Sequence, residues 1–177
     1  MRVLRSLDEL AAPLPAPALT IGNFDGVHAG HRRILAAVAE EARAAGGTAV
    51  AMTFHPHPAR VLGREAPPLL TTLEQRLRLL QENGVDVALV LEFTRELSKL
   101  APHAFVEEIV CRRLGARTVC VGENFRFGHR QAGDVRLLEE LSKEFGFSVR
   151  VIPPVVVGGQ VASSSLVRRL LAEGDVA

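Results

Sequence analysis

The sequence contains no tryptophan and no tyrosine, so any aromatic contact with a ligand must come from its phenylalanines or histidines. Its only cysteines, Cys111 and Cys120, have a spacing that fits neither a metal knuckle nor a disulfide framework, and we expect buried thiols in a reducing compartment. The sequence has no run of about 18 apolar residues and no N-terminal apolar segment typical of a secretory signal. We therefore expect a cytoplasmic protein that does not enter a membrane.

An excess of charge of one sign is also missing. The 21 basic and 20 acidic residues leave a net charge of +1, which provides no strong field for nucleic acid or an anionic membrane. Lys99 and Lys143 are the only lysines, so a lysine-dependent mechanism has few candidates. The chain does have 177 residues, of which 47% are hydrophobic, and this is enough for one domain with a sizeable core.

Apolar strand patterns alternate with helical patterns along the chain. Such an alternation predicts a Rossmann-like, doubly wound parallel α/β sheet with helices on both faces. In such a sheet ligands bind beyond the carboxyl ends of the strands, so a site is expected in the loops that follow them. We expect strands at 18–21, 48–54, 85–91, 118–121 and 147–152, and helices at 31–45, 71–83, 102–114, 134–145 and 163–171.

Several residues mark where these elements begin and end. Thr71 and Glu74 have the spacing of a capping box, and Asp134 and Ser163 are typical N-caps. The valines at 155–157, followed by two glycines, predict a short extended segment and a turn.

The loop after the first expected strand has the composition of a phosphate-binding loop. Its glycines allow close approach of the backbone, and the helix that follows offers free N–H groups at its N-terminus. His28 and His31 are three residues apart and would share one helix face. The alternative is a tight strand-to-helix turn in which the histidines are incidental.

Residues 28–31, His-Ala-Gly-His, match the HxGH signature of nucleotidyltransferases. The wider string at 22–31, Gly-Asn-Phe-Asp-Gly-Val-His-Ala-Gly-His, resembles the FMN adenylyltransferase (FAD synthetase) domain at the N-terminus of bacterial bifunctional riboflavin kinase/FAD synthetases. The resemblance extends over nearly the whole chain. Further blocks agree in the same order at 53–58, 70–74, 121–128 with 133–134, and 163–165 with Arg168.

The resemblance implies adenylyl transfer from ATP to FMN by in-line attack of the FMN phosphate on the α-phosphorus of ATP. FAD and pyrophosphate would be the products. It places His28, His31 and Asn23 at the reacting phosphates, with Mg²⁺ carried by the ATP phosphates rather than by a metal site of the protein. Other residues expected to contact ATP are Gly22, Phe24, Asp25, Gly26, Gly30, Ser163, Ser164, Ser165 and Arg168.

The same resemblance places the flavin near the loops at 54–58 and 124–128, where aromatic and proline side chains offer an apolar surface. One position departs from the family pattern: Leu166 stands where relatives often carry arginine, which puts a phosphate contact there in doubt. The residues expected to contact the flavin are Phe54, Pro56, His57, Pro58, Asn124, Arg126 and Phe127.

Relatives of this kind continue into a riboflavin kinase domain that these 177 residues do not contain. We therefore expect residues 1–177 to form the adenylyltransferase domain, fused to or paired with a kinase domain, and to lack kinase activity. Two other functions stay open: nucleotidyl transfer to another small phosphate, and flavin binding without catalysis. A zinc site at His28, His31, His55 and His57 is a weaker alternative, since no carboxylate or cysteine spacing supports it.

Overall fold

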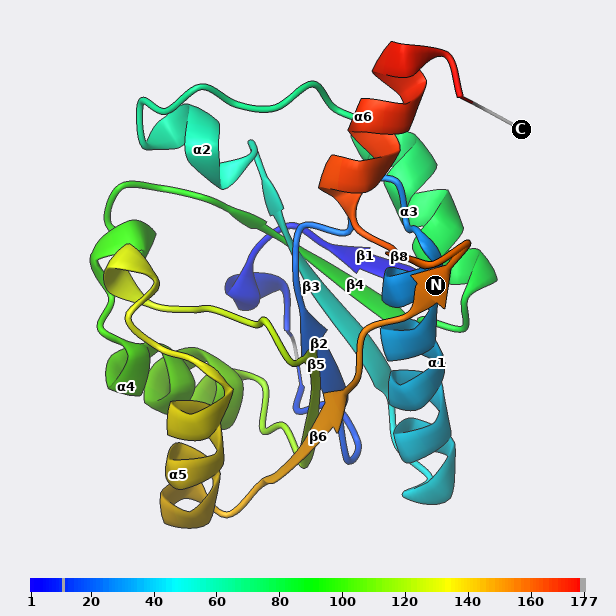
Figure 1. Cartoon of the computed structure of the whole chain (residues 1–177). Helices are drawn as coiled ribbons and strands as arrows, with labels where there is room; N and C mark the ends of the chain where they lie inside the picture. The colour runs from blue at the N-terminus through cyan, green and yellow to red at the C-terminus, as the bar shows by residue number, and fades with distance from the viewer. Residues whose placement is uncertain (11, 176–177) are drawn as a thin grey trace.

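The computed structural model describes residues 1–10 and 12–175, and its centre is a six-stranded sheet (Figure 1). All neighbouring strands are parallel, in the order β1-β4-β3-β2-β5-β6. The strand order reverses between β2 and β5, which makes their carboxyl ends the switch point at which such sheets bind ligands. The strands are β1 (Arg2–Leu4), β2 (Ala18–Ile21), β3 (Ala49–His55), β4 (Val87–Glu92), β5 (Thr118–Gly122) and β6 (Ser148–Ile152).

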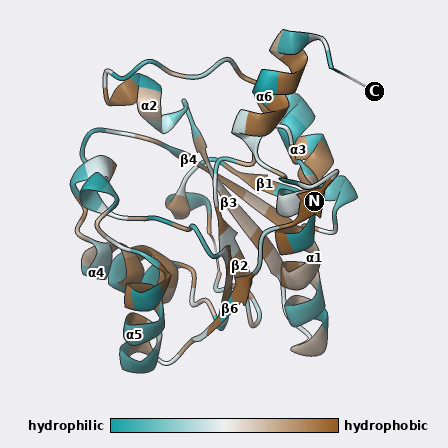
Figure 2. Cartoon of the chain, viewed as in Figure 1, coloured by the Kyte–Doolittle hydropathy of each residue, from teal (hydrophilic) through white to brown (hydrophobic). Residues whose placement is uncertain are grey.

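Helices cover both faces of the sheet. On one face lie α1 (Ala29–Ala44) and α3 (Leu73–Glu82). On the other lie α4 (Pro102–Phe105), its continuation η3 (Val106–Arg113) and α5 (Val135–Phe145). In Figure 2 the strands are largely brown, while the helices carry teal residues on their outer sides. The remaining segments are α2 (Pro58–Val61), α6 (Ser164–Glu173) and the 3₁₀ turns η1 (Leu7–Glu9), η2 (Leu97–Lys99) and η4 (His129–Gln131).

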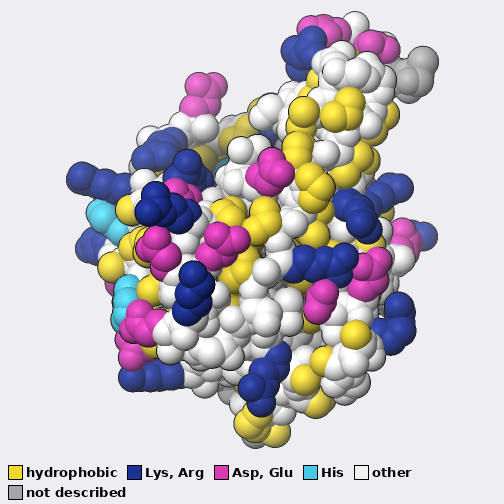
Figure 3. Space-filling view, turned by 60° about the horizontal axis from the view of Figure 1, so that its bottom comes forward, with side chains coloured by type: hydrophobic (Ala, Val, Ile, Leu, Met, Phe, Trp, Pro, Cys, Tyr) yellow, Lys and Arg dark blue, Asp and Glu magenta, His cyan; other side chains and the backbone are white. Residues whose placement is uncertain are grey.

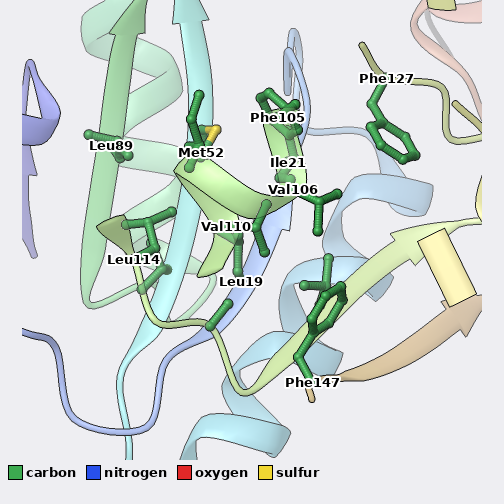
Figure 4. Packing of buried hydrophobic residues seen from close by; sticks show 14 of the residues in the cluster. Leu19, Ile21, Met52, Leu89, Phe105, Val106, Val110, Leu114, Phe127 and Phe147 are labelled. Atoms are coloured by element: carbon green, nitrogen blue, oxygen red, sulfur yellow. The ribbon is translucent and has the colours of Figure 1, made fainter. Parts of the chain in front are cut away.

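The two faces of the sheet differ in the size of their side chains. Because side chains alternate along a strand, Leu19 and Met52 point toward α4, η3 and α5, where they join the main core (Figure 4). The opposite face carries small residues, including Ala18, Ala49 and Ala51. Small residues on this face let α1 pack closely against the sheet.

The structure confirms the expected doubly wound parallel sheet and all five expected strands. The sequence did not indicate β1, a three-residue edge strand that begins with Arg2. The capping box at the start of α3 was predicted one residue too early, because Thr72 caps the helix and Gln75 completes the box. The helix expected at 102–114 is present, but η3 has π-helical hydrogen bonding. Of the two cysteines, Cys120 is buried and Cys111 is only partly buried.

The C-terminal region contains the predicted extended segment, turn and helix, and a second short strand after the turn completes a hairpin that was not predicted. Strands β7 (Val156–Val157) and β8 (Gln160–Val161) pair in antiparallel fashion, and Ser163 caps α6. Helix α6 lies beyond the carboxyl ends of the strands, apart from the two helical layers (Figure 1). Among the residues that the structure describes, no helix has the length and apolar character that a membrane crossing would require.

Candidate active site

The loop between β2 and α1 is anchored by side chains that point into the core. Phe24 and Val27 have φ angles of 50° and 38°, and their side chains are 1% and 0% exposed. Gly22 lies directly over the Phe24 ring, where an added Cβ would be 3.2 Å from a ring carbon. A positive φ is unfavourable for such residues, and burial of both side chains holds the loop in this shape. We expected Phe24 to contact ATP, but its ring faces the core and cannot make this contact.

His28 and His31 form a stacked pair at the start of α1. Their ring centroids are 3.7 Å apart and the planes differ by 28°. Burial lowers the pKa of His28, and burial together with the adjacent His28 lowers the pKa of His31 to about 3. Within the described chain, neither Nδ1 atom has a hydrogen-bond partner, although both are buried. The pair is therefore neutral near pH 7 and keeps unused hydrogen-bonding capacity.

The lowered pKa of His31 predicts a loss of stability in acid. Between about pH 6.5 and pH 3 the unfolded chain binds a proton at this ring and the folded chain does not, so the free energy of unfolding falls as the pH falls. His31 contributes up to about 1.4 kcal/mol per pH unit in this window. Urea unfolding between pH 4 and pH 6.5 should give a shallower pH dependence for His31→Gln than for the natural sequence. Equal slopes would contradict the assignment.

Gly30 brings the start of α6 close to this pair. A Cβ at Gly30 would lie 3.1 Å from the His28 ring and 3.3 Å from the carbonyl oxygen of Ala162. The N-cap Ser163 follows directly, and its Oγ accepts the N–H of Leu166 at 3.1 Å. Ser165 is exposed, and the N–H of Leu166 is used by the cap. Two helix N-termini, those of α1 and α6, thus meet beyond β2, and both favour anions.

A third histidine joins the loop to the end of β3. The side-chain amide nitrogen of Asn23 lies 3.3 Å from His57 Nε2, and Thr53 donates to the Asn23 carbonyl at 3.1 Å. His57 Nδ1 accepts the N–H of Ala59, and burial lowers the pKa of this ring. The structure thus brings together Asn23, expected near the phosphates, and His57, expected near the flavin.

Asp25 is the centre of a second polar cluster. Its carboxylate is 2% exposed and accepts the N–H groups of Leu70 and Thr71 at 3.0–3.1 Å, the Thr71 hydroxyl, and Arg168 Nη2 at 2.6 Å. Burial alone would raise the pKa of Asp25, but these hydrogen bonds outweigh it and hold the pKa below its usual value. Both carboxylate oxygens are occupied, so the carboxylate has no free position for ATP or for a metal ion.

The residues expected at the flavin divide into two groups. Asn124 and Arg126 are exposed, and Arg126 pairs with Asp134 at 3.3 Å. Phe54 is partly buried and meets Phe93 edge to face. Phe127 is only 6% exposed and packs in the main core, which corrects the expectation that its ring offers a flavin surface. Pro56 and Pro58 are partly buried beside His57.

Gly128 sets the shape of the loop that follows β5. Its φ is 72°, and an added Cβ would lie 2.7–2.8 Å from atoms of Pro102. Gly146 has a similar φ of 75° with nothing within 4 Å. We expect Gly128→Ala to lower the free energy of unfolding by about 1–3 kcal/mol more than Gly146→Ala, because only the first adds overpacking to the cost of the positive φ. Urea unfolding of both variants measures this difference, and equal losses would contradict the crowding.

Sequence reasoning missed Arg76, whose side chain lies beneath the site. It is 3% exposed, with Nη2 at 4.0 Å from Asp25 Oδ1 and Nη1 at 3.4 Å from the Thr53 hydroxyl. The available signal was an arginine in helical register with Leu73 and Leu80, on the apolar face of α3.

A cavity of about 730 Å³ lies elsewhere, against the segments that precede β2, β5 and β6. It is therefore at the amino ends of the strands, and none of the expected site residues line it. The candidate active site is the opposite edge of the sheet.

A family model for FAD synthetase matches residues 12–166. The chain belongs to the FAD synthetase family. It is 37% identical, over its whole length, to a bifunctional riboflavin kinase/FMN adenylyltransferase of Escherichia coli strain K12. It is also 31% identical over 99% of its length to the protein of that name in Haemophilus influenzae. The chain spans 57% and 58% of these two relatives.

Solved structures support the fold of this FAD synthetase family member. A Streptococcus pneumoniae protein described as a macrolide-efflux protein superposes with a TM-score of 0.84 at 23% identity, covering 99% of this chain and 58% of its own. Pantothenate synthetase from Thermus thermophilus gives a TM-score of 0.63 at 20% identity over 94% of this chain and 67% of its own. At these identities the likeness concerns the fold alone.

Proposed function

We propose that residues 1–177 form an FMN adenylyltransferase domain, which transfers the adenylyl group of ATP to FMN and gives FAD and pyrophosphate. The observation that carries the proposal is the stacked, neutral pair of His28 and His31 at the point where the N-termini of α1 and α6 meet. Family membership supports the same reaction.

An FMN phosphate oxygen forms a bond to the α-phosphorus of ATP, and the bond to the bridging oxygen of pyrophosphate breaks. Charge accumulates on phosphate oxygens during this step, and fixed donors in a water-poor site stabilise it. Neutral imidazoles can provide such donors without repelling each other at 3.7 Å, which two imidazolium rings could not do. Asn23 and the backbone at Gly22, Gly26 and Gly30 would position the phosphates, with Ser163, Ser164 and Ser165 at the far end.

The flavin would lie between the ends of β3 and β5, on either side of β2. Phe54, Pro56, His57 and Pro58 would form one wall, and Asn124 and Arg126 would form the other. Mg²⁺ would enter with ATP, since hydrogen bonds already engage both oxygens of the Asp25 carboxylate. A riboflavin kinase domain, fused or separate, would supply FMN, and a cytoplasmic location fits both substrates.

Incubation of the chain with ATP, Mg²⁺ and FMN tests the proposal, with FAD and pyrophosphate measured by chromatography and a coupled assay. FAD and pyrophosphate should appear in equal amounts. A panel of other nucleotides and phosphate acceptors serves as the control. Product only from another acceptor would point to a different nucleotidyltransferase, and tight FMN binding without turnover would indicate a flavin-binding module.

A further inference from the structure

Helix α6 is attached to the fold without any residue in the core. None of its ten residues is buried, and Leu171 is 53% exposed. In Figure 3 the helix projects from the body of the molecule at the upper right, and the basic and acidic side chains on the visible face are interspersed. Leu166, Val167 and Leu170 are only partly buried, so polar contacts take a larger share in placing α6 than they do for the helices packed on the sheet.

Three hydrogen bonds join α6 to Pro68 and to the loop between β2 and α1, residues 22–28, which we call the ATP loop because the proposed function places ATP there. The Ser164 hydroxyl donates to the carbonyl oxygen of Asp25 at 2.9 Å. Arg168 donates from Nη2 to Asp25 Oδ2 at 2.6 Å and from Nε to the carbonyl oxygen of Pro68 at 2.7 Å. Two of these bonds end on Asp25, which lies three residues before His28 in the same loop.

The surroundings of Arg168 differ from those of a free phosphate ligand. Its side chain is 18% exposed, and its guanidinium group already bonds to a carboxylate and a backbone carbonyl. Asp25 in turn lies between Arg168 and the buried Arg76. Release of Arg168 toward a phosphate would leave Asp25, among the described residues, with the more distant Arg76 as its remaining ion-pair partner.

We propose that Asp25 and Arg168 are positioning residues that hold α6 against the ATP loop, and that Arg168 does not itself bind phosphate. Through this pair the serines at the start of α6 and the histidines at the start of α1 keep a fixed spacing. The proposal rests on the proposed function, because it concerns how that ATP site is assembled.

A double-mutant cycle separates positioning from direct binding. We expect Asp25→Asn and Arg168→Gln each to lower kcat/KM for ATP by about 10- to 100-fold. The kcat/KM of the double variant should be about equal to that of the less active single variant. If Arg168 binds phosphate by itself, the two losses will multiply, and the proposal is overturned. Should Asp25→Asn fail to fold, Ser164→Ala takes its place in the cycle with the same expectation.

Hydrogen exchange of the ligand-free protein provides a readout that needs no activity. Arg168→Gln should speed amide exchange both at 166–171 in α6 and at 28–32 in α1, because the two segments lose their link. Arg169→Gln is the matched control: Arg169 is the next residue of the helix, bonds to Gln160 at 2.7 Å, and should leave residues 28–32 unchanged. Unchanged exchange at 28–32 in Arg168→Gln would overturn the proposal. An absence of FAD formation by the natural sequence would overturn the proposed function and leave this result standing.

Discussion

The variant His28→Ala should form FAD with a kcat about 10²- to 10³-fold lower than that of the natural sequence, while its affinity for FMN stays nearly unchanged. The imidazole stacks on His31 at the start of α1, where it can donate to phosphate oxygens as they gain charge. Among the described residues, its Nδ1 has no hydrogen-bond partner that would tie the ring to the residues placed at the flavin. Steady-state rates together with FMN titration measure the two effects separately.

His103→Ala is the control for the loss of a histidine. His103 lies on α4 and is exposed, away from the loop that follows β2. Its Nε2 lies 3.0 Å from Glu144 Oε1 on α5. Its removal should leave kcat and FMN affinity as they are. If His28→Ala weakens FMN binding as much as it lowers the rate, the ring acts in flavin binding and not on the phosphates.

Asp25→Ala should lower the free energy of unfolding by about 3–5 kcal/mol, the usual effect of removing one member of a buried ion pair. Arg76 is 3% exposed, and without Asp25 its charge would lack a nearby carboxylate. The N–H groups of Leu70 and Thr71 would lose their acceptor as well. Urea unfolding at neutral pH measures the change in midpoint.

Asp8→Ala provides the matched comparison. Asp8 also pairs with an arginine at 2.6 Å, Arg113, but its side chain is 87% exposed. Solvent screens such a pair, and its loss should cost about 1 kcal/mol or less. Similar losses for the two variants would show that burial does not govern the Asp25 pair.

The sheet and the helix layers could be predicted because their signals are long and local. Each expected strand is mostly apolar and directly adjoins a glycine or a proline at one end at least, which is typical of a strand in a parallel sheet covered by helices. The spacing of three residues predicted that His28 and His31 share one face, but the stacking of their rings was not predicted, since His28 is the N-cap and lies just outside the helix. By contrast, β1 has three residues, too few for any periodicity to appear.

The cluster around Asp25 could not be predicted in the same way. Its partners lie 45, 46 and 143 positions away along the chain. Each partner also has a sufficient local explanation: Thr71 precedes a helix as a capping residue would, and Arg168 follows a serine block like a phosphate ligand. Only the fold shows that the same carboxylate receives hydrogen bonds from both.

The unequal faces of the sheet have a consequence for protein engineering. Helix α1 carries the histidine pair at its N-terminus and lies on the face with Ala18, Ala49 and Ala51. A larger side chain at one of these alanines would push α1 outward and move the histidines with it. Libraries that vary the leucine-rich face should mainly yield variants with altered stability, whereas libraries that vary the alanine face should change the geometry of catalysis.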